Sequence, residues 1–317
     1  MAIKLEHLVG ISGLTKDQIV SLVGVAQEFV EINSRSVKKV PALRGRTIVN
    51  LFLEPSTRTR TSFEIAGKRL SADVINISGS SSSTTKGETL VDTALNIRSM
   101  SPDTIVLRHS FSGSCELLKK MVPGVPIVNA GDGLHEHPTQ ALLDALTLQQ
   151  NFGGLENLTI TMVGDVLRSR VARSNIIMHR ILGNEVRIIA PPTIARKEFE
   201  SWGVKVFHTM KEGLPGSDVV MSLRMKHEYL KDFYIPNLDE YSSMYIVSEG
   251  TLAKYCPNAI VLAPGPIIRG TEITSEVADG PRSMILKQVE NGVAVRMSIL
   301  YLLASKEKSE DLTMEEF

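Results

Sequence analysis

The stretch Glu54-Pro55-Ser56-Thr57-Arg58-Thr59-Arg60-Thr61-Ser62-Phe63-Glu64 is the most informative part of this chain for its fold. It follows an apolar run, 47–53, that predicts a buried strand. It leads into residues at i, i+3, i+4 and i+7, the spacing of the inner face of a helix: Phe63, Ala66, Gly67 and Leu70. The Ser/Thr/Arg cluster is therefore predicted on the first turn of a helix, at the carboxyl end of a strand.

The first turn of that helix suits a bound anion. Its backbone N–H groups have no partner within the helix, and the helix dipole is positive there. Arg58 and Arg60 are unfavourable at this end because like charges meet, and a bound phosphate would remove the conflict. The hydroxyls of Ser56, Thr57 and Thr59 add short donors. The alternative is an ordinary Ser/Thr helix cap with two solvated arginines.

Length and composition allow two domains and argue against several classes of protein. A chain of 317 residues that is 43% hydrophobic can form two cores. A net charge of zero gives no electrostatic reason to expect a nucleic-acid or anionic-membrane partner. Cys115 and Cys256 lack metal-ligand spacing, so we expect two buried thiols in a reducing compartment. The start of the sequence has no apolar signal segment and no apolar run has membrane-spanning length, so we expect a soluble, cytoplasmic protein.

Helix and strand patterns alternate along the chain. A helix is predicted over 15–32, and nearly continuous apolar strands follow at 47–53, 73–77, 104–107 and 126–129. The second half repeats the pattern, with strands at 158–163, 185–190, 204–207, 218–223 and 259–262. Such strands separated by helices indicate parallel sheets covered on both faces. We therefore predict an α/β fold of two doubly wound parallel-sheet domains joined by interdomain helices.

Candidate functional residues recur just after these strands, where doubly wound sheets bind ligands. They are Arg108 and His109, His137 and Gln140, then Arg168, Arg170 and Arg173, and finally Arg224. A lone histidine here is more often structural, and a lone strand-end arginine more often forms a surface ion pair. The recurrence of arginines at strand ends favours a site for anionic ligands.

Two motifs carry a resemblance to a known family. The first stretch resembles the Ser-Thr-Arg-Thr-Arg signature of the aspartate/ornithine carbamoyltransferase superfamily. The run Gly131-Asp132-Gly133-Leu134-His135-Glu136-His137-Pro138-Thr139-Gln140 is similar to the family's second signature. The Thr139 form, with Lys86-Gly87-Glu88 upstream, resembles the aspartate branch, since the ornithine branch usually has Cys in place of Thr139. The resemblance covers the chain from about residue 3 to residue 304.

The resemblance implies transfer of the carbamoyl group of carbamoyl phosphate to the amino group of L-aspartate, a step of pyrimidine biosynthesis. It implies a catalytic set of Arg58, Thr59, Arg108 and His137. It implies a carbamoyl-phosphate site of Ser56, Thr57, Arg58, Thr59, Arg108, His137 and Gln140, with Ser82 and Lys86. The acceptor site would comprise Lys86, Arg170, Arg224, Lys226, Pro264 and Gly265. The departing phosphate can take the amine proton, so neither a cofactor nor a metal is expected.

The resemblance also implies a division into domains. The first domain, for carbamoyl phosphate, would cover 1–136 and regain an apolar helix at 283–304 that crosses back to it. The second domain, for the acceptor, would cover 137–282 and begin with a helix at 138–149. An acidic tail, 305–317, would follow.

The polar segment 79–87 gives a prediction about assembly. By composition alone it is a flexible surface loop. In the aspartate branch the matching loop, here with Ser82 and Lys86, reaches the active site of a neighbouring subunit. The resemblance therefore implies a homotrimer with shared active sites, whereas the residues identify no regulatory or pathway-enzyme partner.

The acceptor half departs from the family pattern at three positions. Lys226 stands where the family has glutamine, Tyr229 where it has arginine, and Ala263 where it has histidine. A lysine makes the pocket more basic than a neutral amide would. These departures support one alternative, a carbamoyltransferase for another amine. A second alternative is a catalytically silent member with a structural or regulatory role, which the loss of Arg58, His137 or Lys86 would have favoured, but all three are present.

Overall fold

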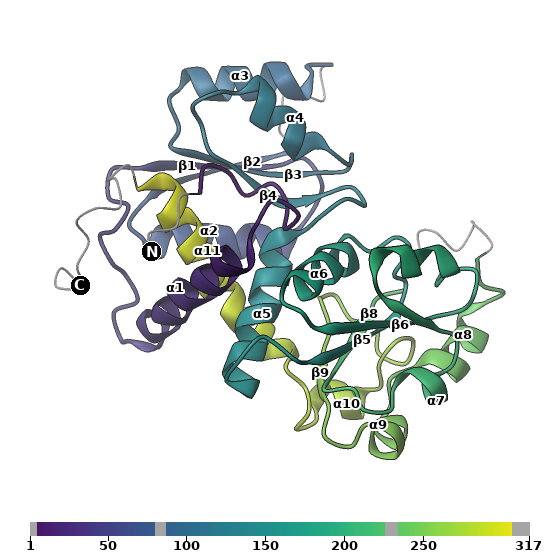
Figure 1. Ribbon diagram of the computed structural model, residues 1–317. Helices are drawn as coiled ribbons and strands as arrows, with labels where there is room; N and C mark the ends of the chain where they lie inside the picture. Colours follow the sequence, from purple (N-terminus) through teal and green to yellow (C-terminus); the bar gives the residue numbers. More distant parts are fainter. Residues whose placement is uncertain (1–4, 80–86, 226–233, 306–317) are drawn as a thin grey trace. The chain divides into compact units, whose positions relative to one another are not determined.

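Figure 1 shows a computed structural model of the chain, which describes residues 5–79, 87–225 and 234–305. The chain folds into two α/β units. Unit 1 runs to Leu146 and resumes at Glu290, and unit 2 is Thr147–Val289. The predicted fold class, with two parallel-sheet α/β domains, is confirmed.

Unit 1 is built on a parallel sheet with the strand order β2-β1-β3-β4. The strands are β1 (Thr47–Phe52), β2 (Asp73–Ser78), β3 (Thr104–His109) and β4 (Ile127–Asp132). The helices are α1 (Lys16–Ser34), α2 (Thr57–Arg69), α3 (Leu90–Ser99), α4 (Ser114–Met121), the first part of α5 (Pro138–Phe152) and most of α11 (Ile285–Ala304). Helices α3 and α4 cover one face of the sheet and α2 and α11 the other (Figure 1). Gly67 allows the close approach on this second face, since a Cβ there would lie 2.6 Å from Val74 Cγ2 and 4.0 Å from Leu300 Cδ1.

Unit 2 is built on a second parallel sheet with the order β7-β6-β5-β8-β9. The strands are β5 (Thr159–Gly164), β6 (Glu185–Ile189), β7 (Lys205–Phe207), β8 (Val219–Leu223) and β9 (Ile260–Leu262). The helices are α6 (Arg170–Ile181), η3 (Lys197–Trp202), α7 (Met210–Gly213), α8 (Leu238–Tyr245), α9 (Glu249–Tyr255) and α10 (Ser275–Asp279). The central strands β5 and β8 are buried nearly throughout, as their apolar runs predict.

Each sheet contains one reversal of strand order. In unit 1 the reversal lies between the neighbours β1 and β3: β2 lies beyond β1 on one side, and β4 lies beyond β3 on the other. In unit 2 it lies between β5 and β8: β6 and β7 lie beyond β5, and β9 lies beyond β8. The loops after such a pair leave in opposite directions and open a crevice at the carboxyl ends of the strands. The topology therefore marks one ligand-binding position in each unit.

The predicted elements match the structure closely. All nine predicted strands are present, although β3 and β4 continue to His109 and Asp132, beyond the predicted ends. The first predicted helix is α1, where the Thr15 side chain and Gln18 form a reciprocal capping box. The predicted domain boundaries at 136/137 and 282/283 differ from the observed division, which falls inside α5 and α11. The first turns of α5 still pack in unit 1, where Ala141, Leu142 and Ala145 are buried.

A search of the described part of the chain finds no helix with the length and hydrophobicity that crossing a bilayer requires. Of the predicted acidic tail, only Ser305 lies within the described residues.

Candidate active site

The candidate anion-binding residues of unit 1 lie at the carboxyl ends of three adjacent strands. Ser56 to Thr59 follow β1, Arg108 is the penultimate residue of β3, and His137 follows β4. The register pairs Phe52 of β1 with Arg108 and Leu107 of β3 with Asn129, so the three strand ends are level. These residues surround the position where the strand order reverses.

The backbone N–H groups at the N-terminus of α2 donate no hydrogen bond to the side chain of the N-cap residue. Ser56 is the N-cap residue, with an extended backbone (φ −161°), but its side chain forms no cap hydrogen bond. By contrast, Thr15, Thr89 and Ser169 accept cap hydrogen bonds at α1, α3 and α6. The first turn of α2 also contains no acidic residue. This turn therefore presents backbone N–H groups and a positive dipole end without a local counter-charge.

The Arg108 guanidinium is fixed by neighbours on both sides. It is 9% exposed, and it donates from Nη1 to the Ala130 carbonyl (3.0 Å) and from Nη2 to Glu54 Oε1 (2.7 Å). Glu54 lies just after β1, so this ion pair joins the ends of β1 and β3. No role was predicted for Glu54, although it lies two residues before the signature motif. Only the strand register reveals its partner.

The start of α5 carries His137 and Gln140. His137 is 5% exposed, and its carbonyl accepts from the Gln140 N–H (3.0 Å). The Gln140 side chain donates from Nε2 to Asp144 Oδ1 (3.0 Å), one helical turn further along. Because the amide nitrogen faces a carboxylate, Gln140 Oε1 is the atom left to accept from a ligand N–H. Asp144 is thus a second residue that the sequence analysis missed; its i+4 spacing from Gln140 was the available signal.

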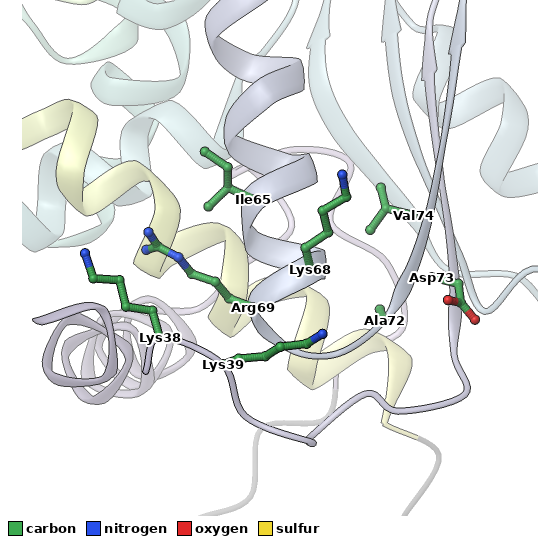
Figure 2. Close-up of a pocket in the computed structure, with 8 residues that line it drawn as sticks. All are labelled: Lys38, Lys39, Ile65, Lys68, Arg69, Ala72, Asp73 and Val74. Carbon is green, nitrogen blue, oxygen red and sulfur yellow. The ribbon is translucent and has the colours of Figure 1, made fainter. Parts of the chain in front are cut away.

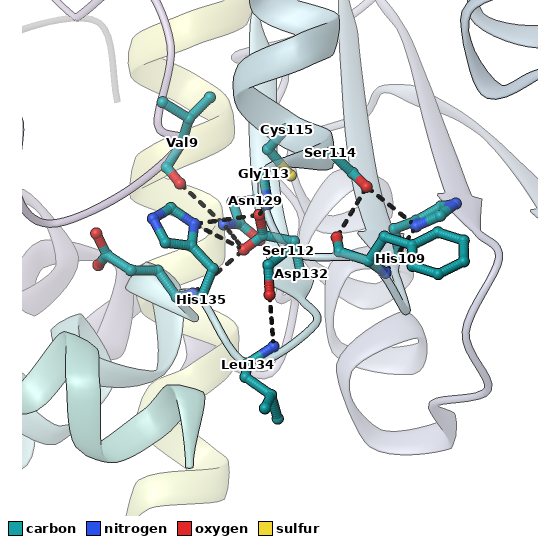
Figure 3. A network of polar contacts seen from close by, with 12 residues as sticks. Val9, His109, Ser112, Gly113, Ser114, Cys115, Asn129, Asp132, Leu134 and His135 are labelled. Carbon is teal, nitrogen blue, oxygen red and sulfur yellow. Dashed lines mark hydrogen bonds and ion pairs between the residues drawn. The ribbon is translucent and has the colours of Figure 1, made fainter. Parts of the chain in front are cut away.

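A buried network holds the loop between β4 and α5 (Figure 3). The Asp132 carboxylate, fully buried, accepts from Gly113 N (2.8 Å), Asn129 Nδ2 (2.8 Å) and Glu136 N (3.2 Å), and lies 3.2 Å from His135 Nδ1. These contacts fix the backbone that leads to His137.

His109, which the sequence analysis noted beside Arg108, has a structural environment. Its Nδ1 accepts from the Phe111 N–H (3.0 Å) and lies 3.0 Å from Ser114 Oγ (Figure 3). Burial lowers the pKa of this imidazole, which favours the neutral ring. The structural interpretation of this histidine therefore fits better than a role in binding an anion.

The candidate acceptor residues of unit 2 follow three adjacent strands of its sheet. Arg170 is the first residue of α6, after β5; Arg224 follows β8; Pro264 and Gly265 follow β9. Arg170 and Arg224 thus flank the reversal of strand order between β5 and β8. Arg168 instead donates from Nε to Asp165 Oδ2 (3.0 Å), and the Arg173 guanidinium lies over the Trp202 ring at 5.1 Å. The structure thereby gives Arg168 and Arg173 intramolecular contacts within unit 2.

The buried carboxyl group of Glu272 interacts electrostatically with Arg224. Glu272 is 2% exposed, and its Oε1 accepts from the Ile268 N–H (2.5 Å). Burial raises the pKa of Glu272 to about 7, while hydrogen bonds from backbone N–H groups and the charge of Arg224 act in the opposite direction. The carboxyl group therefore changes charge near neutral pH, within the electrostatic reach of Arg224.

Three predicted site residues lie outside the described residues: Ser82 and Lys86 in the gap 80–86, and Lys226 in the gap 226–233. Tyr229, one of the departures from the family pattern, falls in the second gap. Their predicted roles are therefore not addressed by the geometry.

A basic hollow of about 680 Å³ lies away from these residues (Figure 2). Its charged lining is Lys38, Lys39, Lys68, Arg69 and Asp73. It lies at the C-terminus of α2 and the start of β2, whereas Arg58 lies at the N-terminus of α2. Lys68 is paired with Glu64 (2.6 Å), and Arg69 Nη1 donates to Asn33 Oδ1 (2.5 Å). The hollow is therefore not part of the candidate active site.

Among the described residues, no three His, Cys, Asp or Glu side chains are grouped as they would be around a metal ion. Cys115 and Cys256 are both buried, and neither forms a disulfide.

Two family models match almost the whole chain. The model described as "Aspartate/ornithine carbamoyltransferase, carbamoyl-P binding domain" matches residues 6–150, and the "Asp/Orn binding domain" of the same family matches residues 156–303. The aspartate carbamoyltransferase catalytic subunit of Desulfotalea psychrophila is 54% identical over 299 residues, which cover 94% of each chain.

Solved structures show the same fold. An aspartate transcarbamoylase from Trypanosoma cruzi, determined with carbamoyl phosphate and aspartate, has a TM-score of 0.82 at 28% identity, covering 94% of this chain and 95% of its own. An ornithine carbamoyltransferase from Pyrococcus furiosus has a TM-score of 0.84 at 25% identity, covering 97% of this chain and 100% of its own. The fold alone therefore does not distinguish the two acceptors.

We expect Arg58→Ala to weaken the binding of inorganic phosphate at least tenfold, a loss of about 1.4 kcal/mol, because a charge-assisted contact to the anion is removed. Without phosphate, the thermal stability should be unchanged or slightly higher, since arginine opposes the dipole of α2. Calorimetric titration with phosphate and thermal unfolding measure the two effects. Arg98→Ala, which removes an exposed arginine from the last turn of α3, is the control and should keep the wild-type phosphate affinity. A folded Arg58→Ala protein with unchanged affinity would rule out an anion site at α2.

Proposed function

Because the chain belongs to the aspartate/ornithine carbamoyltransferase family, we propose that it transfers the carbamoyl group of carbamoyl phosphate to the amino group of L-aspartate. The products are N-carbamoyl-L-aspartate and phosphate, which assigns the reaction to pyrimidine biosynthesis. One observation carries this proposal: the N-terminus of α2 has no side-chain cap and lies beside Arg58. Together with Arg108, which Glu54 and the Ala130 carbonyl hold in place, this helix end suits a phosphate group. A cytoplasmic location accompanies the proposal, in keeping with the two free thiols.

The chemistry of unit 2 supports aspartate rather than ornithine as the acceptor. Arg170 and Arg224 leave two strand ends on either side of the strand-order reversal, and two guanidinium groups suit an acceptor with two carboxylates. Ornithine carries a cationic side chain, which the same pair would repel. The 54% identity with an aspartate carbamoyltransferase catalytic subunit supports the same choice.

The proposed reaction is a direct attack of the uncharged amine on the carbonyl carbon. A C–N bond forms, the C–O bond to phosphate breaks through a tetrahedral intermediate, and the departing phosphate takes the amine proton. Negative charge develops on the carbonyl oxygen, where we assign Thr59, Arg108 and His137 as donors. Preorganised donors of this kind each contribute about 3–4 kcal/mol in other enzymes. The ion pair with Glu54 and the hydrogen bond to Ala130 support such a role for Arg108, because they hold its guanidinium in place before substrate arrives.

Substrate positioning is the second part of the proposal. We assign Ser56, Thr57, Arg58 and Arg108 to the phosphate group and Gln140 Oε1 to the carbamoyl NH₂. The Gln140–Asp144 hydrogen bond supports this orientation of the amide. Holding two small reactants together can contribute roughly 7–11 kcal/mol, so a site without covalent chemistry is sufficient for this reaction.

We expect His137→Ala to lower kcat at least tenfold and to change the carbamoyl-phosphate KM much less. The reason is that a hydrogen bond to the carbonyl oxygen strengthens as charge develops there. Steady-state kinetics with each substrate varied in turn measure the two constants. His135→Ala, two residues earlier and with a side chain 39% exposed, is the control and should affect kcat less. A pure KM effect of His137→Ala would assign this residue to ground-state binding.

We further propose a homotrimer in which Ser82 and Lys86 of one subunit complete the site of its neighbour. If so, mixing inactive Arg58→Ala protein with inactive Lys86→Ala protein should restore part of the activity, because some hybrid trimers contain a site with both wild-type residues. Native mass spectrometry confirms subunit exchange, and each variant mixed with itself is the control. Confirmed hybrids without recovered activity would mean that Lys86 does not act across subunits.

The proposed activity itself is tested by product formation from carbamoyl phosphate with aspartate, ornithine and a panel of other amines. We expect robust carbamoylation of aspartate, and we expect Arg224→Ala to raise the aspartate KM at least tenfold while leaving phosphate affinity unchanged. Turnover with another amine and none with aspartate would favour the alternative raised by Lys226, Tyr229 and Ala263. Binding of carbamoyl phosphate without turnover of any amine would favour a catalytically silent member of the family.

A further inference from the structure

Arg296 of α11 is a buried cation that the assigned reaction does not use. Its side chain is 4% exposed, and the guanidinium lies over the Phe63 ring at 5.2 Å. It donates from Nη1 to the Gly292 carbonyl (2.9 Å) and from Nη2 to Thr139 Oγ1 (3.4 Å). Neither acceptor is charged, and among the described residues its Nε has no hydrogen-bond partner.

This environment is electrostatically unfavourable for a charged group. Burial and the charge of Arg108 both lower the pKa of Arg296, to about 10, while Asp144 acts in the opposite direction. The guanidinium therefore remains charged at neutral pH. A buried cation without a directly bonded carboxylate weakens the folded state unless another negative charge compensates it.

The helix is adapted to hold this side chain. A Cβ on Gly292 would lie 2.5 Å from Arg296 Nη1 and 3.2 Å from Leu143 Cδ2, so only glycine leaves room for the guanidinium in its present position. Glycine in the interior of a helix is unfavourable compared with alanine. The chain thus combines two unfavourable features, a buried cation and a helix-interior glycine, at one position.

The buried Asp144 carboxylate offsets only part of the cost of this charge. The other neighbours of Arg296 indicate what could compensate the rest. Thr139 belongs to the first turn of α5, between His137 and Gln140, and Phe63 belongs to α2. Arg108 is close enough to affect the protonation of Arg296. All three neighbours lie on elements that form the candidate phosphate site of unit 1.

We propose that Arg296 is a further electrostatic component of this site, whose charge is compensated by the phosphate group of bound carbamoyl phosphate without direct contact. The proposal rests on the function proposed above. In a buried region, where the effective dielectric constant is low, a fixed cation attracts an anion over a longer distance than in water. Because phosphate carries two negative charges, it can be stabilised by more cations than it touches.

A purely structural role for Arg296 makes the opposite prediction. If the guanidinium served only to fill space and bond to Thr139, its replacement would lower stability and leave anion affinity unchanged. If it serves the anion, replacement by an apolar side chain of similar length should weaken phosphate binding. In the absence of phosphate, the same replacement should leave stability equal or higher, because the buried charge is gone.

The test compares Arg296→Met and Arg296→Lys with the wild type, by calorimetric titration with inorganic phosphate and by thermal unfolding with and without it. We expect Arg296→Met to weaken phosphate binding at least fivefold, with an unfolding temperature in phosphate-free buffer no lower than that of the wild type. Arg296→Lys keeps the charge and should bind phosphate more tightly than Arg296→Met. In steady-state kinetics Arg296→Met should raise the carbamoyl-phosphate KM and leave the aspartate KM unchanged.

A glycine pair gives a test that keeps the arginine. Gly292→Ala should displace the guanidinium and weaken phosphate binding, whereas Gly24→Ala, in the interior of α1 with no atom within 4 Å of the added Cβ, should not. If Arg296→Met does not fold, the comparison of Gly292→Ala with Gly24→Ala still tests whether Arg296 contributes to phosphate binding. Wild-type phosphate affinity in Gly292→Ala, or in folded Arg296→Met, would overturn the proposal and leave the assigned function intact. A wild-type protein that fails to bind phosphate would reject the assigned function itself.

Discussion

The concentration of positive charge at the carboxyl ends of β1 and β3 is the constraint on which the rest of unit 1 depends. The dipole of α2, Arg58 and Arg108 carry the same sign, and Glu54 is the carboxylate paired directly with Arg108. Such a concentration of like charge is locally unfavourable, and a bound anion would relieve it. The surrounding contacts, from the Ala130 carbonyl to the Asp132 network, hold these charges in place against their mutual repulsion.

The two sheets share one topological feature, a single reversal of strand order. Arginines lie at or just after the carboxyl ends of the two strands that flank each reversal. In unit 1 the arginines accompany a helix N-terminus and hydroxyl groups, which suit a phosphate. In unit 2 Arg224 instead lies within the electrostatic reach of Glu272, whose pKa of about 7 makes this part of the site sensitive to pH. Below that pH the carboxyl group is protonated and no longer offsets the charge of Arg224.

The sequence predicted most of the fold and the positions of the main candidate residues, because the strands are continuous apolar runs and the motifs follow them directly. It could not predict contacts that depend on tertiary packing. The pairing of Glu54 with Arg108 needs the register of β1 and β3, and Arg296 bonds Thr139 across a separation of 157 residues. A signal for Arg296 did exist, since it is the only charged residue between Gly292 and Ala304. The positions where the units divide have no signal in the sequence, because the apolar patterns of α5 and α11 continue through them.

The division inside α11 has a consequence for the order in which the protein is made. Unit 1 contains residues from both ends of the chain, so the ribosome must synthesise all of unit 2 before Leu300 can pack near Gly67. At the usual rate of about 5–20 residues per second, this delay lasts roughly 7–30 s. During that interval the apolar face of α2 and β1 that α11 later covers has to be kept from aggregation. Unit 1 is therefore complete only after α11 has emerged, whereas unit 2 is one continuous segment of the chain.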